Sequence, residues 1–107
     1  MYDYNINDVL QHKAIEIAEA LTEDTLIQDR LIDITERLWY SFLKQKPVST
    51  LNLIERIGMD TESIMLFNKF IVRLSKENWI ISTVNSNFAT IELNKEEVEK
   101  RIKEEKG

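Results

Sequence analysis

The polar side chains best suited to binding a ligand lie between residue 50 and residue 76. An amide and three cations recur there at spacings of one, four and three residues, which places them on adjoining rows of one helix face. Lysine and arginine donate hydrogen bonds to phosphate oxygens, arginine also pairs with guanine, and asparagine pairs with adenine. A serine near the start of the same helix is expected on the same outward face, and an arginine in the preceding helix adds a further donor. The residues predicted to contact nucleic acid are Arg56, Ser63, Asn68, Lys69, Arg73 and Lys76.

The sequence contains no set of side chains suited to catalysis or to metal binding. His12 is the only histidine, and its position on an acidic amphipathic helix predicts a solvated side chain. No glycine-rich phosphate loop, nucleophile elbow or cluster of histidine and cysteine is present. The acidic pairs at 96–97 and 104–105 lie in a polar tail, where nothing would give the two carboxylates different roles. We therefore predict a protein that is not an enzyme and that needs no cofactor or metal ion.

Hydrophobic residues spaced three or four apart indicate several helices around the candidate residues. Ile27, Leu31 and Ile34 illustrate this pattern, and Pro47 ends their helix because the residue before proline avoids helical geometry. Dense β-branched and aromatic residues on both sides of a short polar turn indicate a hairpin. The predicted helices cover 6–20, 23–45, 50–57, 61–76 and 95–105, and the predicted strands cover 79–84 and 88–93.

The central part of the chain is predicted to form helix, turn, helix and hairpin in that order. Gly58 follows the first of these helices where the backbone needs a positive φ, and Asp60 or Thr61 can cap the next one. This order is the winged helix–turn–helix layout, so the predicted fold class is mostly α with a small β-hairpin, with extra N-terminal and C-terminal helices. We treat residues 1–107 as a single domain, made of an acidic helix over 1–21, a winged-helix body over 23–93 and a charged helix over 95–107.

The net charge of −5 is confined to the N-terminal part of the chain. Residues 1–26 hold one basic and six acidic residues, whereas residues 27–94 hold eight of each sign and residues 95–107 hold five of each. The body that carries the candidate contacts is therefore neutral, so its charge does not exclude DNA. The sequence has no cysteine, no apolar run long enough to span a membrane and no signal segment. These features predict an intracellular protein, in the cytoplasm or nucleoid, or in the nucleus of a eukaryote.

Two stretches resemble known winged-helix families. Leu51 to Ile80 resembles a bacterial or archaeal winged helix–turn–helix regulator, in the string L-N-L-I-E-R-I-G-M-D-T-E-S-I. Leu74 to Phe88, L-S-K-E-N-W-I-I-S-T-V-N-S-N-F, is similar to the end of the C-terminal winged helix of the middle subunit of replication protein A. That family has a shorter second helix, a longer wing turn and a preceding oligonucleotide-binding domain. The first resemblance implies DNA binding, and the second implies docking of helical segments from DNA-repair proteins.

Two functions remain open on these residues. A small regulator of transcription or replication would place the helix over 61–76 in the major groove of duplex DNA, with Asn68 reading bases and Arg56 contacting the backbone from the flank. The wing from Ser82 to Thr90, however, has no lysine or arginine. That absence favours a docking module that binds an amphipathic partner helix within a DNA-processing complex. The predicted docking residues are Met65, Val72, Val84 and Phe88, of which the last two would also suit a hairpin that closes onto the core.

Spare apolar surface predicts a homodimer built from the N-terminal helix, with help from the second helix or the C-terminal tail. Leucine, isoleucine and alanine recur on that helix at helical spacing, in a stripe that a compact winged helix does not obviously need. Leu66 and Phe70 add apolar surface on the helix over 61–76. A dimer would double the number of DNA contacts. The residues of the N-terminal stripe are Leu10, Ala14, Ile17 and Leu21.

Overall fold

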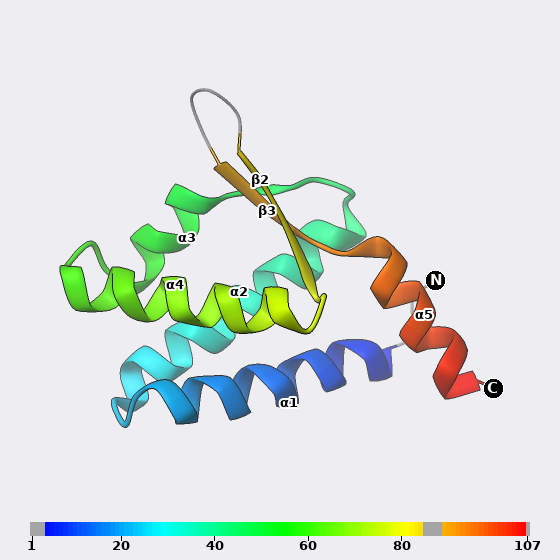
Figure 1. Ribbon diagram of the computed structural model, residues 1–107, viewed down its shortest axis with the longest axis horizontal. Helices are drawn as coiled ribbons and strands as arrows, with labels where there is room; N and C mark the ends of the chain where they lie inside the picture. Colours follow the sequence, from blue (N-terminus) through cyan, green and yellow to red (C-terminus); the bar gives the residue numbers. More distant parts are fainter. Residues whose placement is uncertain (1–3, 85–88, 107) are drawn as a thin grey trace.

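Five helices and three short strands make up the computed structural model, which describes residues 4–84 and 89–106 (Figure 1). Helices form the larger part, as the sequence predicts, beside a small antiparallel sheet. In chain order the elements are α1 (Tyr4–Leu21), α2 (Thr25–Leu43), β1 (Val48–Ser49), α3 (Thr50–Ile57), α4 (Thr61–Lys76), β2 (Ile80–Val84), β3 (Ala89–Leu93) and α5 (Lys95–Lys106). The bounds of α3 and α4 are those expected from the sequence.

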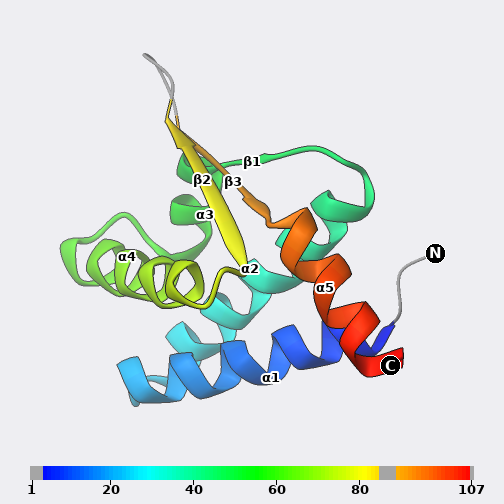
Figure 2. The same ribbon diagram turned by 45° about the vertical axis from the view of Figure 1, so that its right-hand side comes forward.

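The apolar stripe of α1 faces the protein's own core, which makes the stated reason for a dimer through this stripe wrong. Three of its four residues are fully buried, and Leu21 is partly buried against the same core. Leu66 and Phe70 are buried as well, at 5% and 0% exposure. The cause is the position of α1, which lies along α2 and α4 in both views (Figures 1 and 2) and so covers the apolar faces of both helices. Leu10, Ala14 and Ile17 are therefore not available for a contact between two copies.

The turn between α3 and α4 is built from short-range polar contacts. Gly58 has φ +144°, as predicted, and the carbonyl oxygen of Ile57 accepts a hydrogen bond from Arg30 Nη1 at 2.8 Å. Asp60 caps α4, because its side chain accepts from the Ser63 backbone N–H at 3.1 Å and from the Ser63 hydroxyl at 2.7 Å. These hydrogen bonds from Ser63 hold the pKa of Asp60 below its ordinary value. Ser63 is only 5% exposed, so its predicted place on the outward face of α4 is wrong.

Replacing Gly58 by alanine should destabilise the protein by about 1 kcal/mol or more, because this backbone conformation is unfavourable for any residue with a Cβ. The added Cβ would also lie 2.8 Å from Asp60 Oδ1 and 2.9 Å from Ser63 Oγ. Urea denaturation followed by circular dichroism measures the difference in unfolding free energy. Met59→Ala is a matched control, since Met59 is the next residue of the same turn and is 58% exposed. A Gly58→Ala protein as stable as the wild type would contradict the turn geometry.

The sheet has the strand order β1–β3–β2, with both pairings antiparallel. The edge strand β1 was not predicted. It joins the segment before α3 to the hairpin, because Val48 pairs with Ile91 of β3. The first hairpin strand begins one residue later than predicted, at Ile80, and the second is described from Ala89 to Leu93. The predicted turn and Phe88 lie outside the described residues. In Figure 1 the hairpin projects from the side of the molecule opposite α1.

The C-terminal helix α5 is attached to the body of the protein. Its first turn is capped by Asn94, whose side-chain oxygen accepts from the Glu97 backbone N–H at 3.4 Å. Val98 is fully buried in the core and Ile102 packs against it. Figure 2 shows α5 beside the N-terminal end of α1. The apolar side of α5 is therefore used within the chain.

Candidate nucleic-acid interface

One long face of α4 is open to solvent and carries most of the predicted contact residues. Asn68, Lys69, Arg73 and Lys76 are all exposed on it. Met65 and Val72, which are seven residues apart and therefore on the same side of the helix, are 47% and 51% exposed. The structure thus brings residues predicted for DNA binding and residues predicted for docking onto a single surface, which we call the α4 face.

The cations of the α4 face are available for a ligand. Within the part of the chain that the structure describes, Lys69, Arg73 and Lys76 form no ion pair. Arg73 and Lys76 lie in the last turn of α4, where positive charge is stabilised by the helix dipole. The acidic residue of this helix, Glu62, lies at the other end, in its first turn. The middle and C-terminal parts of the α4 face are therefore positively charged.

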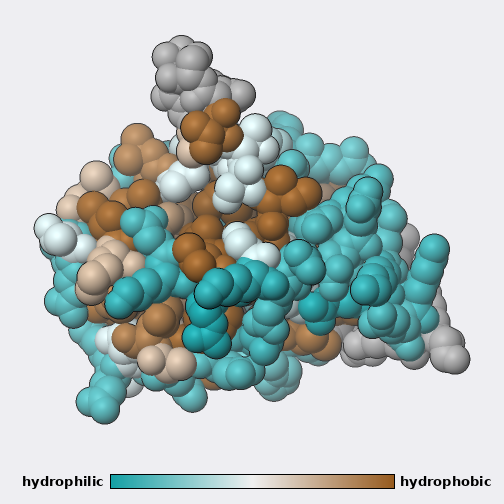
Figure 3. Space-filling model, in the orientation of Figure 1, coloured by the Kyte–Doolittle hydropathy of each residue, from teal (hydrophilic) through white to brown (hydrophobic). Residues whose placement is uncertain are grey.

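A groove of about 350 Å³ runs beside α4, lined by Asn68, Lys69, Val72, Arg73 and, from α1, Leu21. Leu21 was assigned to a dimer contact from the sequence, and its part in this groove was missed because spacing along α1 does not show which helix lies beside it. Figure 3 shows hydrophobic side chains gathered on the half of this view that holds α4 and the sheet, whereas the half near α5 is hydrophilic. The α4 face is thus a mixture of positive charge and apolar surface.

Arg56 is not brought to the α4 face. It lines a separate groove of about 540 Å³ between α2 and α3. Asp33, Glu36 and Glu55 line the same groove, and Asp33 is paired with Arg37 at 3.2 Å. A phosphate that approached Arg56 would meet these carboxylates. The structure therefore weakens the expectation that Arg56 contacts DNA from the flank of α4.

The hairpin is exposed and uncharged on its outer strand β2. Val84 is 78% exposed and Ile81 is 44% exposed, while Ser82 and Thr83 are also open to solvent. The expectation that Val84 closes the hairpin onto the core is therefore wrong. In its described strands, Ile80–Val84 and Ala89–Leu93, there is no lysine or arginine.

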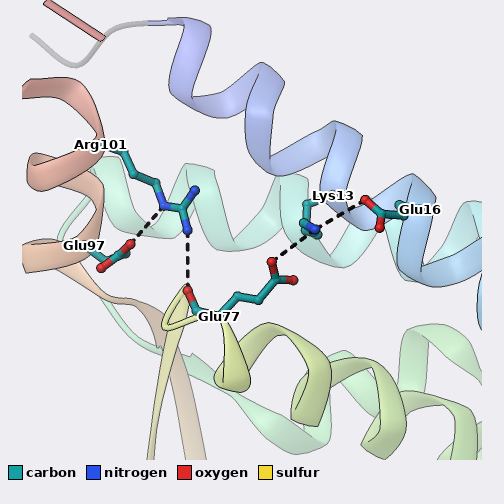
Figure 4. A network of polar contacts seen from close by, with 5 residues as sticks. All are labelled: Lys13, Glu16, Glu77, Glu97 and Arg101. Carbon is teal, nitrogen blue, oxygen red and sulfur yellow. Dashed lines mark hydrogen bonds and ion pairs between the residues drawn. The ribbon is translucent and has the colours of Figure 1, made fainter. Parts of the chain in front are cut away.

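Polar contacts fix the C-terminal end of α4 to the two terminal helices (Figure 4). The Glu77 carboxylate accepts from Lys13 Nζ at 3.1 Å, and the Glu77 carbonyl oxygen accepts from Arg101 Nη2 at 3.5 Å. Lys13 also contacts Glu16 at 3.3 Å, and Arg101 pairs with Glu97 at 3.1 Å. The hydrogen bond to Glu77, followed by that to Glu16, raises the pKa of Lys13. The contacts of Glu77 position α4 and were not predicted from the sequence, since they depend on the packing of helices that are distant along the chain.

Other kinds of site were sought in the same residues. In the described ranges 4–84 and 89–106, no three histidine, aspartate or glutamate side chains lie close enough to hold a metal ion. None of the helices in these ranges is long and apolar enough to cross a membrane. Comparison of the chain with protein-family models, with curated proteins and with solved structures gave no match.

Proposed function

We propose that this chain is a small winged-helix DNA-binding protein, a regulator of transcription or replication without enzymatic activity. In this proposal α3 and α4 form the helix–turn–helix, α4 enters the major groove, and the hairpin β2–β3 is the wing. The order of helices and strands supports the assignment. The strand β1 supports it further, because it ties the hairpin to the start of α3 and so fixes the wing relative to α4.

The observation that carries the proposal is the set of cations on the α4 face that form no ion pair with any described residue. Lys69 and Arg73 are placed to reach phosphate oxygens, and Lys76 extends the row by one turn. Asn68 is exposed beside them and has the donor and acceptor that pair with adenine. Val72 would lie against base edges, where apolar side chains contact the thymine methyl group. A helix with this face can supply both the position and the sequence preference of a DNA contact.

Fluorescence anisotropy with a labelled mixed-sequence duplex tests the proposal. The affinity should fall steeply between about 50 mM and about 200 mM salt, because contacts between cations and phosphates release counterions. The wing contributes no cation from its described strands, so the salt dependence should be carried by α4. Absence of binding in the lower salt concentration would overturn the DNA-binding proposal.

A second candidate function is docking of an amphipathic partner helix, favoured by the exposure of Val84 together with the uncharged strand β2. An apolar strand that projects from the body and is open to solvent suits contact with the apolar face of a helix. Met65 and Val72 on the α4 face would extend that contact. This candidate uses the apolar part of the surface, whereas DNA binding uses its cations.

Val84→Asp distinguishes the docking candidate. Because Val84 is 78% exposed, the substitution should change the unfolding free energy by no more than about 0.5 kcal/mol. Thr83→Asp is the matched control, since Thr83 is also exposed and points to the other side of the sheet. If the docking function is correct, the wild type and Thr83→Asp should retain a partner protein in a pull-down, and Val84→Asp should lose it. Equal retention by all three proteins would remove Val84 from any docking surface.

A further inference from the structure

The helices α1 and α4 lie side by side and run in opposite directions (Figures 1 and 2). At one end Lys13 of α1 contacts Glu77 just after α4, at 3.1 Å. Toward the other end Leu21 of α1 lines the groove with Lys69 and Arg73. Positions along the two helices therefore correspond, so that residues 16–19 of α1 fall at the level of the stretch 69–76 of α4.

The two helices present opposite charges to solvent at this level. On α4, Lys69 and Arg73 are exposed and have no ion pair among the described residues. On α1, Glu16 and Glu19 are exposed, and the Glu16 side chain keeps 65% exposure even though it contacts Lys13. The groove between the helices has Leu21 of α1 and Val72 of α4 as its apolar lining residues. Of these two neighbouring helices, α4 thus carries a cationic ridge and lines the groove, and α1 carries an acidic ridge.

We propose that a second copy of this chain covers the groove, in a two-fold dimer in which α1 of each copy packs across α4 of the other. The two-fold axis runs along the groove, parallel to both helices. Rotation about it places α1 of one copy opposite α4 of the other and keeps the position of every residue along the helix axes unchanged. Glu16 and Glu19 of one copy then face Arg73 and Lys69 of the other, twice over. Leu21 and Val72 from both copies meet at the centre, where each is removed from water.

The surface itself indicates a second copy as the occupant. One chain carries both charges of the complementary pair, so two identical chains satisfy both ridges at once. In this arrangement α1 of one copy also runs antiparallel to α4 of the other, as the two helices do within one chain, which opposes their dipoles favourably. The dimer differs from the one predicted from the sequence, because three of the four stripe residues expected at the interface, Leu10, Ala14 and Ile17, are buried in each copy.

Charge reversal tests the dimer. One variant carries Lys69→Glu and Arg73→Glu, and the other carries Glu16→Lys and Glu19→Lys. Each alone places like charges opposite each other and should weaken dimer formation by at least about tenfold. An equimolar mixture should restore it, because a heterodimer of the two variants again pairs opposite charges at both contacts. Glu96→Lys with Glu99→Lys is the matched control, since these exposed residues of α5 have the same spacing and sign.

Sedimentation velocity at about 100 µM protein detects a weakly associating dimer, and salt near 50 mM keeps the Debye length above about 10 Å. A dimer of the wild type and of the control, monomers of both reversed variants and a dimer in their mixture support the proposal. A monomeric wild type overturns it, as does a mixture that stays monomeric. Circular dichroism checks folding, and the single reversals Arg73→Glu and Glu19→Lys give the same test if a double variant unfolds.

The dimer and duplex DNA would compete for Lys69 and Arg73, a consequence that rests on the proposed function, whereas the dimer itself does not. The variant with Glu16→Lys and Glu19→Lys separates the two, because it loses the dimer and keeps both cations of the α4 face. It should bind DNA at least as tightly as the wild type. Failure of this variant to bind DNA counts against the proposed function, and failure of the reversal mixture to associate counts against the dimer.

Discussion

Alanine at both Lys69 and Arg73 is expected to weaken binding to mixed-sequence duplex DNA by about a hundredfold at about 0.1 M salt. Each cation that contacts a phosphate releases about one counterion, so the slope of log affinity against log salt should become shallower by about two units. Both side chains are exposed and form no ion pair within the described residues, so the loss should be in binding and hardly in stability. Anisotropy titrations at several salt concentrations measure affinity and slope together.

The control for this experiment removes two cations from another part of the surface. Lys95→Ala with Lys100→Ala changes the net charge equally, and both residues are exposed on α5 instead of the α4 face. If binding is a general attraction to the protein's charge, the two double variants will lose the same affinity. A large loss for Lys69 and Arg73 with a small loss for the α5 pair would place the contact on α4. An unchanged slope of log affinity against log salt for the Lys69→Ala, Arg73→Ala variant would contradict a phosphate contact on α4.

Much of the α4 face could be predicted from the sequence, because helical spacing alone determines which residues share a side of a helix. The same reasoning shows why Ser63 was misplaced. It lies four residues before Phe67 and seven before Phe70, both fully or almost fully buried, so the spacing puts it on the buried side. The polar character of serine favoured the outward assignment, whereas the structure uses its hydroxyl as a donor to Asp60. At this position the spacing from buried residues predicted burial better than the polarity of the side chain did.

Other features depend on contacts between distant segments and leave no local signal. The strand β1 has only two residues, too few to show alternation, and it exists because Val48 pairs with Ile91 far along the chain. The position of Arg56 beside the carboxylates of α2 likewise follows from the packing of α3 on α2. The burial of the α1 stripe has the same origin. Periodicity predicts an apolar face correctly, and whether that face meets its own chain or a second copy is decided by tertiary structure.

Trp79→Ala should have the largest effect on stability, a loss of about 3–5 kcal/mol in unfolding free energy, because it removes a large aromatic side chain from a packed core. Trp79 is 1% exposed and follows Asn78, whose φ of +64° turns the chain from α4 into β2. The guanidinium of Arg101 lies 4.0 Å from the centre of the indole ring, so the same ring holds α5 in place. Amide hydrogen exchange should therefore become faster in α5 as well as in the core.

Trp79→Phe separates packing from hydrogen bonding at this position. The indole N–H is buried and has no hydrogen-bond partner in the described residues, so phenylalanine loses volume without losing a hydrogen bond. Its cost should be about 1–2 kcal/mol, well below that of alanine, and its ring can still lie under Arg101. Urea denaturation followed by circular dichroism compares the three proteins without depending on the fluorescence of the substituted residue. Similar losses for phenylalanine and alanine would show that the indole nitrogen contributes to stability, which would contradict packing as the main role of Trp79.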